Sequence, residues 1–158
     1  MLNSKEKTSK VNIRFSDLDL FGHVNNAVYL TYFEEARVAY FNEVVGYDYD
    51  WSTEGVILAR VEIDFVIPVH FKDEVFIRTK CCRMGSKSFD LAYEMFIVKE
   101  EKEIMLSSAT SVMVMYNYKE KKSILVSEEW KVKLVSSKWH YLLVTSAIFQ
   151  CNSIISNW

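Results

Sequence analysis

Residues 16–26, SDLDLFGHVNN, join a short alternating stretch to a stretch with helical periodicity. The alternation of apolar and polar residues in VNIRF, at 11–15, predicts a half-buried strand. The junction itself holds two aspartates, a glycine, a histidine and two asparagines. Asp and Asn are common where a loop enters a helix because they cap and turn the chain, so capping alone is one explanation of this composition.

The stretch with helical periodicity covers residues 26–45. Its apolar residues recur at spacings of three and four, and polar residues cluster on the opposite side. Asn25 or Asn26 can cap its start, and Gly46 suits the position just past its end. The sequence therefore predicts a long helix that is buried on more than one side.

Beyond this helix the period of the pattern changes to two. Short polar turns at 84–87 and 99–103 are of the kind that joins antiparallel strands that are neighbours in the sequence. Ser127 followed by two glutamates predicts the start of a second helix. The order is strand, helix, four strands, helix, which indicates an α+β fold. Because one helix cannot cover a whole sheet with open edges, we expect the chain to dimerise. The alternating runs are 59–67, 73–83, 88–98 and 104–116.

The composition is that of one compact domain. The chain has 158 residues, of which 50% are apolar, with one Pro and four Gly. Its net charge of −2 predicts no nucleic-acid partner. Three cysteines, two of them the adjacent Cys81 and Cys82, form neither a disulfide framework nor a metal-binding spacing. Free thiols and a polar N-terminus without a secretory signal favour a cytoplasmic protein.

The C-terminal stretch, residues 139–158, contains no Asp, Glu, Lys or Arg. Its apolar residues are interrupted by Thr, Ser, Gln and Asn, which makes it too polar for a clear membrane span of about 20 apolar residues. A tail that packs on the domain or covers a partner is favoured over a membrane contact.

Two other loop chemistries fit the junction poorly. A calcium loop starting at Asp17 would need ligands at its fifth position, Phe21, and at its twelfth, Val28. An aspartyl-phosphate phosphatase would need a doubly wound α/β domain, whereas here the strands follow one another without helices between them. No metal site is predicted.

The junction fits acyl transfer to water better. The first N–H groups of the helix, at Asn26, lack intrahelical partners and carry partial positive charge, so they can stabilise an oxyanion. Gly22 lets the chain pass close to a substrate. Asp17 or Asp19 could activate a water or attack a carbonyl. His23 could relay a proton, but positioning of the turn is its favoured role.

Residues 17–37, DLDLFGHVNNAVYLTYFEEAR, closely resemble the DxDxxGHVNNxxYxxYxExAR signature of the hotdog-fold acyl-CoA thioesterases, the group typified by 4-hydroxybenzoyl-CoA thioesterase. The likeness continues through 59–75 and 83–89 and covers roughly residues 10–134. It implies a five-stranded antiparallel sheet wrapped around a long central helix, in a single hotdog domain over 1–158 with 135–158 as a C-terminal extension. It also implies homodimers, often associated into homotetramers, with active sites at the dimer interface.

The resemblance assigns roles to individual residues. The second Asp of the signature, here Asp19, is implied to be the catalytic carboxylate, and Asn26 marks the helix-terminal N–H that polarises the thioester carbonyl. Gly22 and His23 line the same turn. The substrate is an acyl-CoA, so coenzyme A is part of the substrate and no metal or other cofactor is expected. The segment that touches the coenzyme A arm contains Arg83, Lys87 and Ser88.

Several alternatives stay open at this stage. Some hotdog thioesterases use an acid on the central helix, so Glu34 and Glu35 are also candidates, although a solvated face or an ion pair with Arg37 is the commoner reason for such residues. Asp19 could act as nucleophile or as general base. A different class of function is a hotdog module that binds acyl-CoA or a partner protein without hydrolysing it. The sequence does not specify the length of the acyl chain. It also does not specify whether the acyl group is carried by coenzyme A or by an acyl carrier protein.

Overall fold

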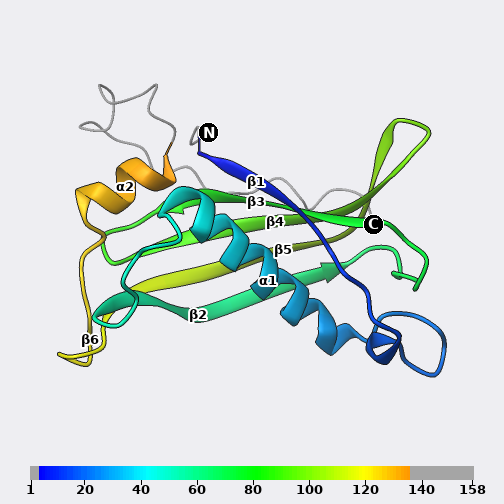
Figure 1. The fold of residues 1–158 in the computed structure, drawn as a ribbon, viewed down its shortest axis with the longest axis horizontal. Helices are drawn as coiled ribbons and strands as arrows, with labels where there is room; N and C mark the ends of the chain where they lie inside the picture. The colour runs from blue at the N-terminus through cyan, green and yellow to red at the C-terminus, as the bar shows by residue number, and fades with distance from the viewer. Residues whose placement is uncertain (1–3, 136–158) are drawn as a thin grey trace.

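The computed structural model describes residues 4–135, in which one curved sheet partly surrounds one helix (Figure 1). The predicted tail therefore lies outside the described residues, apart from its first residue, Val135. The elements, in chain order, are β1 (Glu6–Lys10), a 3-10 turn (Phe15–Asp17), α1 (Asn26–Val44), β2 (Glu54–Phe65), β3 (Val75–Met84), β4 (Ser88–Lys99), β5 (Lys102–Asn117), β6 (Lys122–Ser123) and α2 (Glu128–Leu134).

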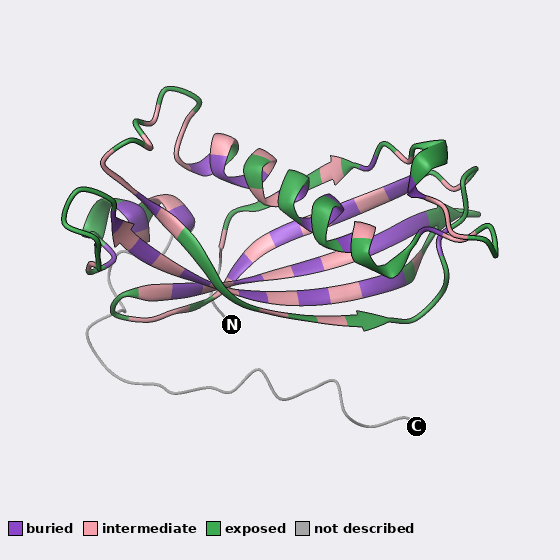
Figure 2. Ribbon diagram, turned by 90° about the horizontal axis from the view of Figure 1, so that it is seen from below, coloured by how far each residue is buried: buried purple, intermediate pink, exposed green. Residues whose placement is uncertain are grey.

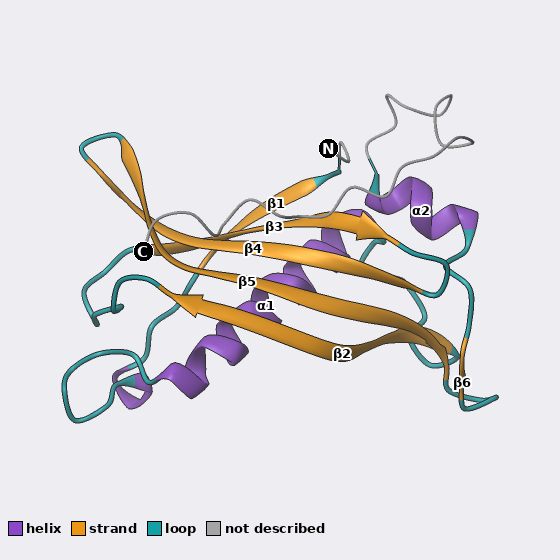
Figure 3. Ribbon diagram, turned by 180° about the vertical axis from the view of Figure 1, so that it is seen from behind, coloured by secondary structure: helices purple, strands orange, loops and turns teal. Residues whose placement is uncertain are grey.

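The sheet is antiparallel throughout and confirms the predicted α+β class. Its strand order is β1-β3-β4-β5-β2, and β6 pairs with β5. The described residues thus form six strands rather than the expected five, because a two-residue strand is added after β5. Both predicted polar turns join sequence neighbours, β3 to β4 and β4 to β5. The path leaves β1 and β2 as the outer strands (Figure 3).

The first strand is not where the alternation at 11–15 predicts it. Strand β1 is Glu6–Lys10 and pairs with β3 from Glu6 opposite Lys80 to Lys10 opposite Phe76. Val11 makes the last backbone contact, its N–H donating to Val75 O at 2.8 Å, and the chain then leaves the sheet to reach the start of α1. An outer strand with one solvated face can be almost entirely polar, so EKTSK carries no apolar signal.

Helix α1 has 19 residues and ends one residue earlier than predicted. It is about 28 Å long, whereas the 16 residues of β5 extend over about 50 Å. It is therefore not long relative to the sheet and leaves part of the inner face uncovered. The Asn25 side chain caps its start by accepting from Ala27 N–H at 2.9 Å, and Gly46, with φ of 107°, follows its end. The buried side of the helix faces the buried residues of the strands (Figure 2).

Helix α2 starts at the predicted cap, Ser127, whose Oγ accepts from Trp130 N–H at 3.3 Å. The Trp130 side chain, 3% exposed, closes one end of the core, and its Nε1–H donates to Tyr49 Oη at 3.2 Å. None of the helices within residues 4–135 is both long and apolar enough to cross a membrane. The rings whose centroids lie within 6 Å of the Trp130 ring belong to Phe41, Tyr49, Trp51 and Phe89.

Replacing Trp130 by Ala should lower the free energy of unfolding by about 3–5 kcal/mol, because it leaves a cavity among these rings. Val132, on the same helix but exposed, is the matched control: Val132→Ala should change the free energy by less than about 0.5 kcal/mol. Urea unfolding followed by far-UV circular dichroism measures both. Equal effects of the two substitutions would show that α2 is not docked through Trp130.

Candidate active site

The junction folds into a tight hairpin that leads directly into α1. The Asp19 N–H donates to His23 O at 2.8 Å, and the Asn25 N–H donates to Asp17 O at 2.9 Å. Gly22 has a φ of 78°, in the left-handed region that favours glycine, and lies in the chain reversal. Asp17 thus lies opposite Asn25, the residue that precedes the helix. Asp19 lies two residues beyond Asp17, which is about 7 Å of extended chain.

Asp19 is half-buried, and the hairpin itself holds its carboxylate in place. Its Oδ1 accepts hydrogen bonds from Phe21 N–H at 2.8 Å and from His23 N–H at 3.2 Å. Its Oδ2 has no hydrogen-bond partner in the part of the chain that the structure describes. One oxygen thus organises the turn, as Asp commonly does, and the other is available to a ligand.

Asn26 begins the helix and is exposed to solvent. The preceding residue, Asn25, accepts hydrogen bonds from two of the first helical N–H groups. Its Oδ1 accepts from the Ala27 N–H and its backbone carbonyl accepts from the Val28 N–H, both at 2.9 Å. The Asn26 N–H itself has no acceptor within residues 4–135. The structure therefore leaves one unused donor at the positive end of the helix, at the predicted position.

Asp17, the first acid of the junction, is 5% exposed and anchors the hairpin. Its carboxylate accepts from the Tyr32 hydroxyl at 2.6 Å and from Arg14 N–H at 2.9 Å. Burial raises the pKa of Asp17, but the hydrogen bonds from Tyr32 and Arg14 outweigh this effect and leave the pKa below its usual value. Burial and the Asp17 charge together raise the pKa of Tyr32. Asp17 thus stays ionised and fixes the hairpin to α1.

His23 packs against the loop between β2 and β3. Its ring meets the His70 ring edge to face, with centroids 4.8 Å apart, and the neighbouring Val24 N–H donates to Val69 O at 2.8 Å. This contact docks the hairpin on its second side. No cluster of three or more His, Cys, Asp or Glu side chains in residues 4–135 is arranged to hold a metal ion.

The segment expected to touch coenzyme A lies at the other end of the molecule. Arg83 is already engaged, because its Nε–H and Nη2–H donate to Asp90 at 2.6 and 2.8 Å. Lys87 is exposed and has no ion pair among the described residues, and Ser88 begins β4. The turn lies beside α2, whereas Asn26 starts α1 at the opposite end (Figure 1). One chain therefore does not bring Arg83, Lys87 and Ser88 to Asp19.

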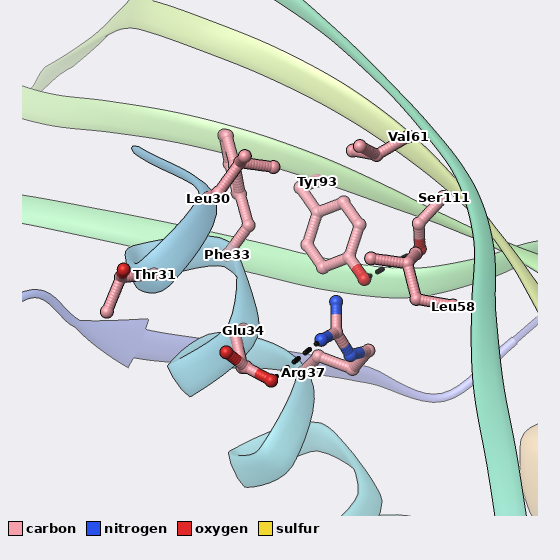
Figure 4. Close-up of a pocket in the computed structure, with 9 residues that line it drawn as sticks. All are labelled: Leu30, Thr31, Phe33, Glu34, Arg37, Leu58, Val61, Tyr93 and Ser111. Carbon is pink, nitrogen blue, oxygen red and sulfur yellow. Dashed lines mark hydrogen bonds and ion pairs between the residues drawn. The ribbon is translucent and has the colours of Figure 1, made fainter. Parts of the chain in front are cut away.

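A cavity of about 170 Å³ lies between α1 and the sheet (Figure 4). It does not include Asp19 or Asn26. Glu34, one of the two helix acids, lines it, whereas Glu35 lines a second cavity of about 130 Å³ next to β1. The residues around the first cavity are Leu30, Thr31, Phe33, Glu34, Arg37, Leu58, Val61, Tyr93 and Ser111.

The sequence profile of the thioesterase-like superfamily matches residues 13–134, which is most of the chain. The chain belongs to this superfamily. The match begins just before the hairpin and ends with α2, so it covers the junction, both helices and strands β2 to β6, whereas β1 precedes it.

Individual proteins are also similar to this chain. YsmA of Bacillus subtilis strain 168 is 35% identical over 85 residues, which covers 54% of this chain and 57% of YsmA. The chain thus spans little more than half the length of this curated relative. Among solved structures, the PA2801 protein of Pseudomonas aeruginosa shares 27% identity with a TM-score of 0.71, over 83% of this chain and 97% of that one.

Two further solved structures carry names that state a ligand or a substrate. A thioesterase from Thermus thermophilus, complexed with coenzyme A and Zn, shares 27% identity with a TM-score of 0.68, over 84% of this chain and 92% of that one. Slr0204, a 1,4-dihydroxy-2-naphthoyl-CoA thioesterase from Synechocystis, shares 18% identity with a TM-score of 0.70, over 82% of this chain and 96% of that one. The second likeness shows the fold alone.

Sequence reasoning missed three side chains of this thioesterase-like protein. Tyr32 lies 15 positions after its partner Asp17, and its place in the helix stripe does not distinguish it from a core aromatic. Tyr93 and Ser111 meet across β4 and β5 at 2.8 Å, which only the strand register brings about. No local pattern signals the contact between Tyr93 and Ser111, whereas Asp17 and Tyr32 are both fixed positions of the signature at 17–37.

Asp17→Asn should lower the free energy of unfolding at pH 7 by about 1–3 kcal/mol, because a buried ionised acceptor is lost. The folded-state pKa of Asp17 lies below its unfolded value, so the stabilisation is present above about pH 4 and is lost as pH falls through the folded-state pKa. The stability difference between wild type and variant should therefore shrink below about pH 5.

Chemical denaturation between pH 3 and 7 measures this difference. The exposed Asp48 provides the control, since Asp48→Asn should leave stability nearly unchanged across the range. A difference between wild type and Asp17→Asn that is the same at every pH would contradict the proposed ionised anchor.

Proposed function

We propose that this chain hydrolyses an acyl-CoA thioester to a free acid and coenzyme A, with Asp19 as the catalytic carboxylate. One observation carries the proposal: a carboxylate with a free oxygen, Asp19 Oδ2, is fixed in the same short hairpin that ends at the unused Asn26 N–H. Thioester hydrolysis needs these two functions, a base or nucleophile and an oxyanion donor. Membership of the superfamily supports the reaction class.

The proposed chemistry starts with the thioester carbonyl oxygen on the Asn26 N–H. Asp19 takes a proton from a water, the resulting hydroxide adds to the carbonyl carbon, and the helix terminus stabilises the oxyanion. The tetrahedral intermediate then expels the coenzyme A thiolate, which takes the proton from the Asp19 carboxyl, so that the thiol leaves and the Asp19 carboxylate is restored. We assign Asp19 as a general base, because its half-buried carboxylate is accessible to water.

The hairpin is suited to this role because it is held from two sides. Asp17 binds Tyr32 of α1 on one side, and His23 packs on His70 on the other. A base and an oxyanion donor are effective only when their separation is constant, since misplacement by about 1 Å can cost about a hundredfold in rate. Gly22 and His23 contribute to substrate binding by shaping this turn.

A second copy of the chain supplies what one chain lacks. Strand β2 is an open edge with exposed apolar residues, including Ile57 at 38% and Phe65 at 47%. Two-fold antiparallel pairing of two β2 strands would bring opposite ends of the two copies together. The Lys87 turn of one copy would then approach Asp19 of the other. We therefore propose a homodimer as the functional unit, with a homotetramer as its further association.

Lys87 is the best candidate for a phosphate contact in that arrangement. It is exposed and has no ion pair among the described residues, whereas the guanidinium of Arg83 is held by Asp90. Arg83 would then act through the shape of the turn, and Ser88 would contact the pantetheine arm. The relative from Thermus thermophilus in complex with coenzyme A supports this ligand class. Coenzyme A is part of the substrate, and the proposed reaction needs no metal or other cofactor.

Asp19→Asn should lower kcat by about 100- to 1,000-fold, because the base is lost while the oxyanion donor remains. The assay is release of free thiol from a panel of short, medium, long and aromatic acyl-CoAs. Asp48→Asn should retain the activity of the wild type, and Asp17→Asn should lower kcat less than Asp19→Asn does.

Equal and small effects of the substitutions at Asp17 and Asp19 would refute the role of Asp19. A large loss in Glu34→Gln or Glu35→Gln instead would assign the reaction to a helix acid. Binding of acyl-CoAs without release of thiol from any of them would favour the alternative function, a non-catalytic acyl-CoA-binding module.

The proposed dimer predicts a solution mass that is twice, or on further association four times, the 18.5 kDa of the chain. Ile57→Lys places a charge at the open edge and should shift the protein toward monomer and lower thiol release at least tenfold. Val98→Lys, at a more exposed apolar site near the end of β4, is the control and should do neither. Light scattering coupled to size exclusion measures the mass, and a fully active monomer would contradict the proposal.

A further inference from the structure

Four large apolar side chains are exposed at the end of the molecule that holds the Asp19 hairpin. Leu20 and Phe21 form the tip of the hairpin, where Leu20 is fully exposed and Phe21 is 84% exposed. Phe15 and Phe71 lie at its base, and their rings meet edge to face with centroids 6.1 Å apart. The hairpin and the loop between β2 and β3 lie at the same end of the sheet (Figure 1). These four apolar residues are called the tip cluster below.

The hairpin that carries the tip cluster is held in place from both sides. The Tyr32 hydroxyl donates to Asp17 at 2.6 Å, which fixes the hairpin to α1. The Val24 N–H donates to Val69 O at 2.8 Å, which fixes it to the loop between β2 and β3. Apolar side chains on such a fixed turn cannot fold back onto the core, so they stay in contact with water until a partner covers them. A contiguous cluster of this kind marks a surface that meets an apolar partner.

Two basic residues flank the base of the tip cluster. Arg14 precedes Phe15 and Lys72 follows Phe71, so each ring has a basic neighbour in the chain. Both basic side chains are exposed. Lys72 has no ion pair among residues 4–135. Long basic side chains beside exposed rings suit a surface that is apolar inside and anionic outside.

Three acids near the cluster are buried or already engaged. Asp17 is buried, and Asp73 Oδ2 accepts from the His70 N–H at 2.8 Å. The Glu74 carboxylate pairs with the Lys10 ammonium at 2.6 Å. The exposed charges directly beside the two rings are therefore basic, and they complement the phosphates of an anionic lipid surface.

The tip cluster is adjacent to the proposed reaction centre. Leu20 and Phe21 follow Asp19 directly, so the three residues lie within about 7 Å of one another along the chain. Segments that bind a lipid surface bury their apolar side chains about 5–10 Å into the boundary between headgroups and acyl chains. Insertion of the tip would therefore bring Asp19 to the level of the headgroups. A long-chain acyl-CoA in a bilayer keeps its acyl chain among the lipid tails and its charged coenzyme A in water, so its thioester lies at that same level.

We propose that the tip cluster docks the protein on an anionic lipid surface. Leu20 and Phe21 lie among the lipid tails, and Lys72 binds lipid phosphate. Asp19 there meets long-chain acyl-CoAs that are dissolved in the membrane. This substrate class rests on the proposed hydrolase, whereas the docking does not. The proposed homodimer presents one hairpin at each of its ends, so it docks through one end at a time.

Cosedimentation with lipid vesicles tests the docking. The full-length protein should bind vesicles of phosphatidylcholine and phosphatidylglycerol in equal parts. Leu20→Ser should raise the lipid concentration at half-maximal binding about tenfold, because the burial of a leucine in an apolar layer is worth at least this factor. Tyr47→Ser is the matched control, since Tyr47 is 82% exposed in the loop after α1, at the other end of the helix, and should bind as the wild type does.

A second pair of variants tests the charge. Lys72→Gln should weaken binding to the mixed vesicles about fivefold and leave binding to pure phosphatidylcholine vesicles unchanged, because it removes one contact with anionic lipid. Lys119→Gln removes an exposed positive charge on the turn between β5 and β6 and should change neither.

Thiol release from palmitoyl-CoA, with and without the mixed vesicles, tests the substrate class. Vesicles should raise the rate of the wild type at least about threefold, because docking raises the local concentration of a membrane-dissolved substrate. Leu20→Ser should lose this gain. Without vesicles the two proteins should hydrolyse palmitoyl-CoA at the same rate, since the Leu20 side chain is fully exposed and not part of the proposed reaction centre.

The outcomes separate the docking from the hydrolase. Thiol release by a wild type that does not bind vesicles would overturn the docking and leave the hydrolase standing. Equal vesicle binding by wild type, Leu20→Ser and Lys72→Gln would place the lipid contact elsewhere in the chain and would also overturn it. A monomeric Leu20→Ser in light scattering would assign the tip cluster to contact between copies and overturn the docking.

Two outcomes bear on the substrate class alone. Vesicle binding that depends on Leu20 but brings no gain in rate would overturn the membrane-dissolved substrate and keep the docking. Vesicle binding that depends on Leu20, without thiol release from any acyl-CoA, would remove the hydrolase and the substrate class and keep the docking.

Discussion

The hydrogen bond from the Tyr32 hydroxyl to the buried Asp17 carboxylate is the contact on which the rest of the site depends. It joins a residue in the second turn of α1 to the loop that enters that helix, at 2.6 Å. An ionised carboxylate at 5% exposure must keep its donors, so the hairpin cannot move away from the helix without leaving a charge unpaired. Asp19 is two residues further on, and its position relative to Asn26 follows from this anchor and from the packing of His23 on His70.

Two neighbouring carboxylates therefore have different roles because their surroundings differ. Asp17 has donors from three groups and almost no solvent, which suits an anchor. Asp19 uses one oxygen to shape the turn, and its other oxygen has no hydrogen-bond partner among residues 4–135, which suits the role that we propose for it. In the cavity, the Tyr93 hydroxyl and Ser111 Oγ lie within hydrogen-bond distance of each other.

The placement of α1 leaves apolar residues of the edge strand β2 exposed. A helix of 19 residues covers the middle of the inner face but not the edge strand β2, and apolar residues of β2 stay exposed. The same helix holds the Asp19 hairpin at its start and lies near the Lys87 turn at its end, so the two segments are a helix length apart. The homodimer that we propose would resolve both features by pairing through the β2 edge, since an antiparallel two-fold brings opposite ends together.

The sequence by itself determined the element order, the caps of both helices, the turns of the sheet and, through the signature at 17–37, the superfamily. These depend on local periodicity, on side chains that bond their own backbone, and on a long motif, all of which can be read along the chain. The tertiary structure alone decided the place of the polar edge strand β1, the partner of Asp17, the distance between Lys87 and Asp19, and the meeting of Arg37 with Tyr93 and Ser111. Those contacts arise from strand register and helix placement, which bring together residues that are far apart in the chain and carry no local signal.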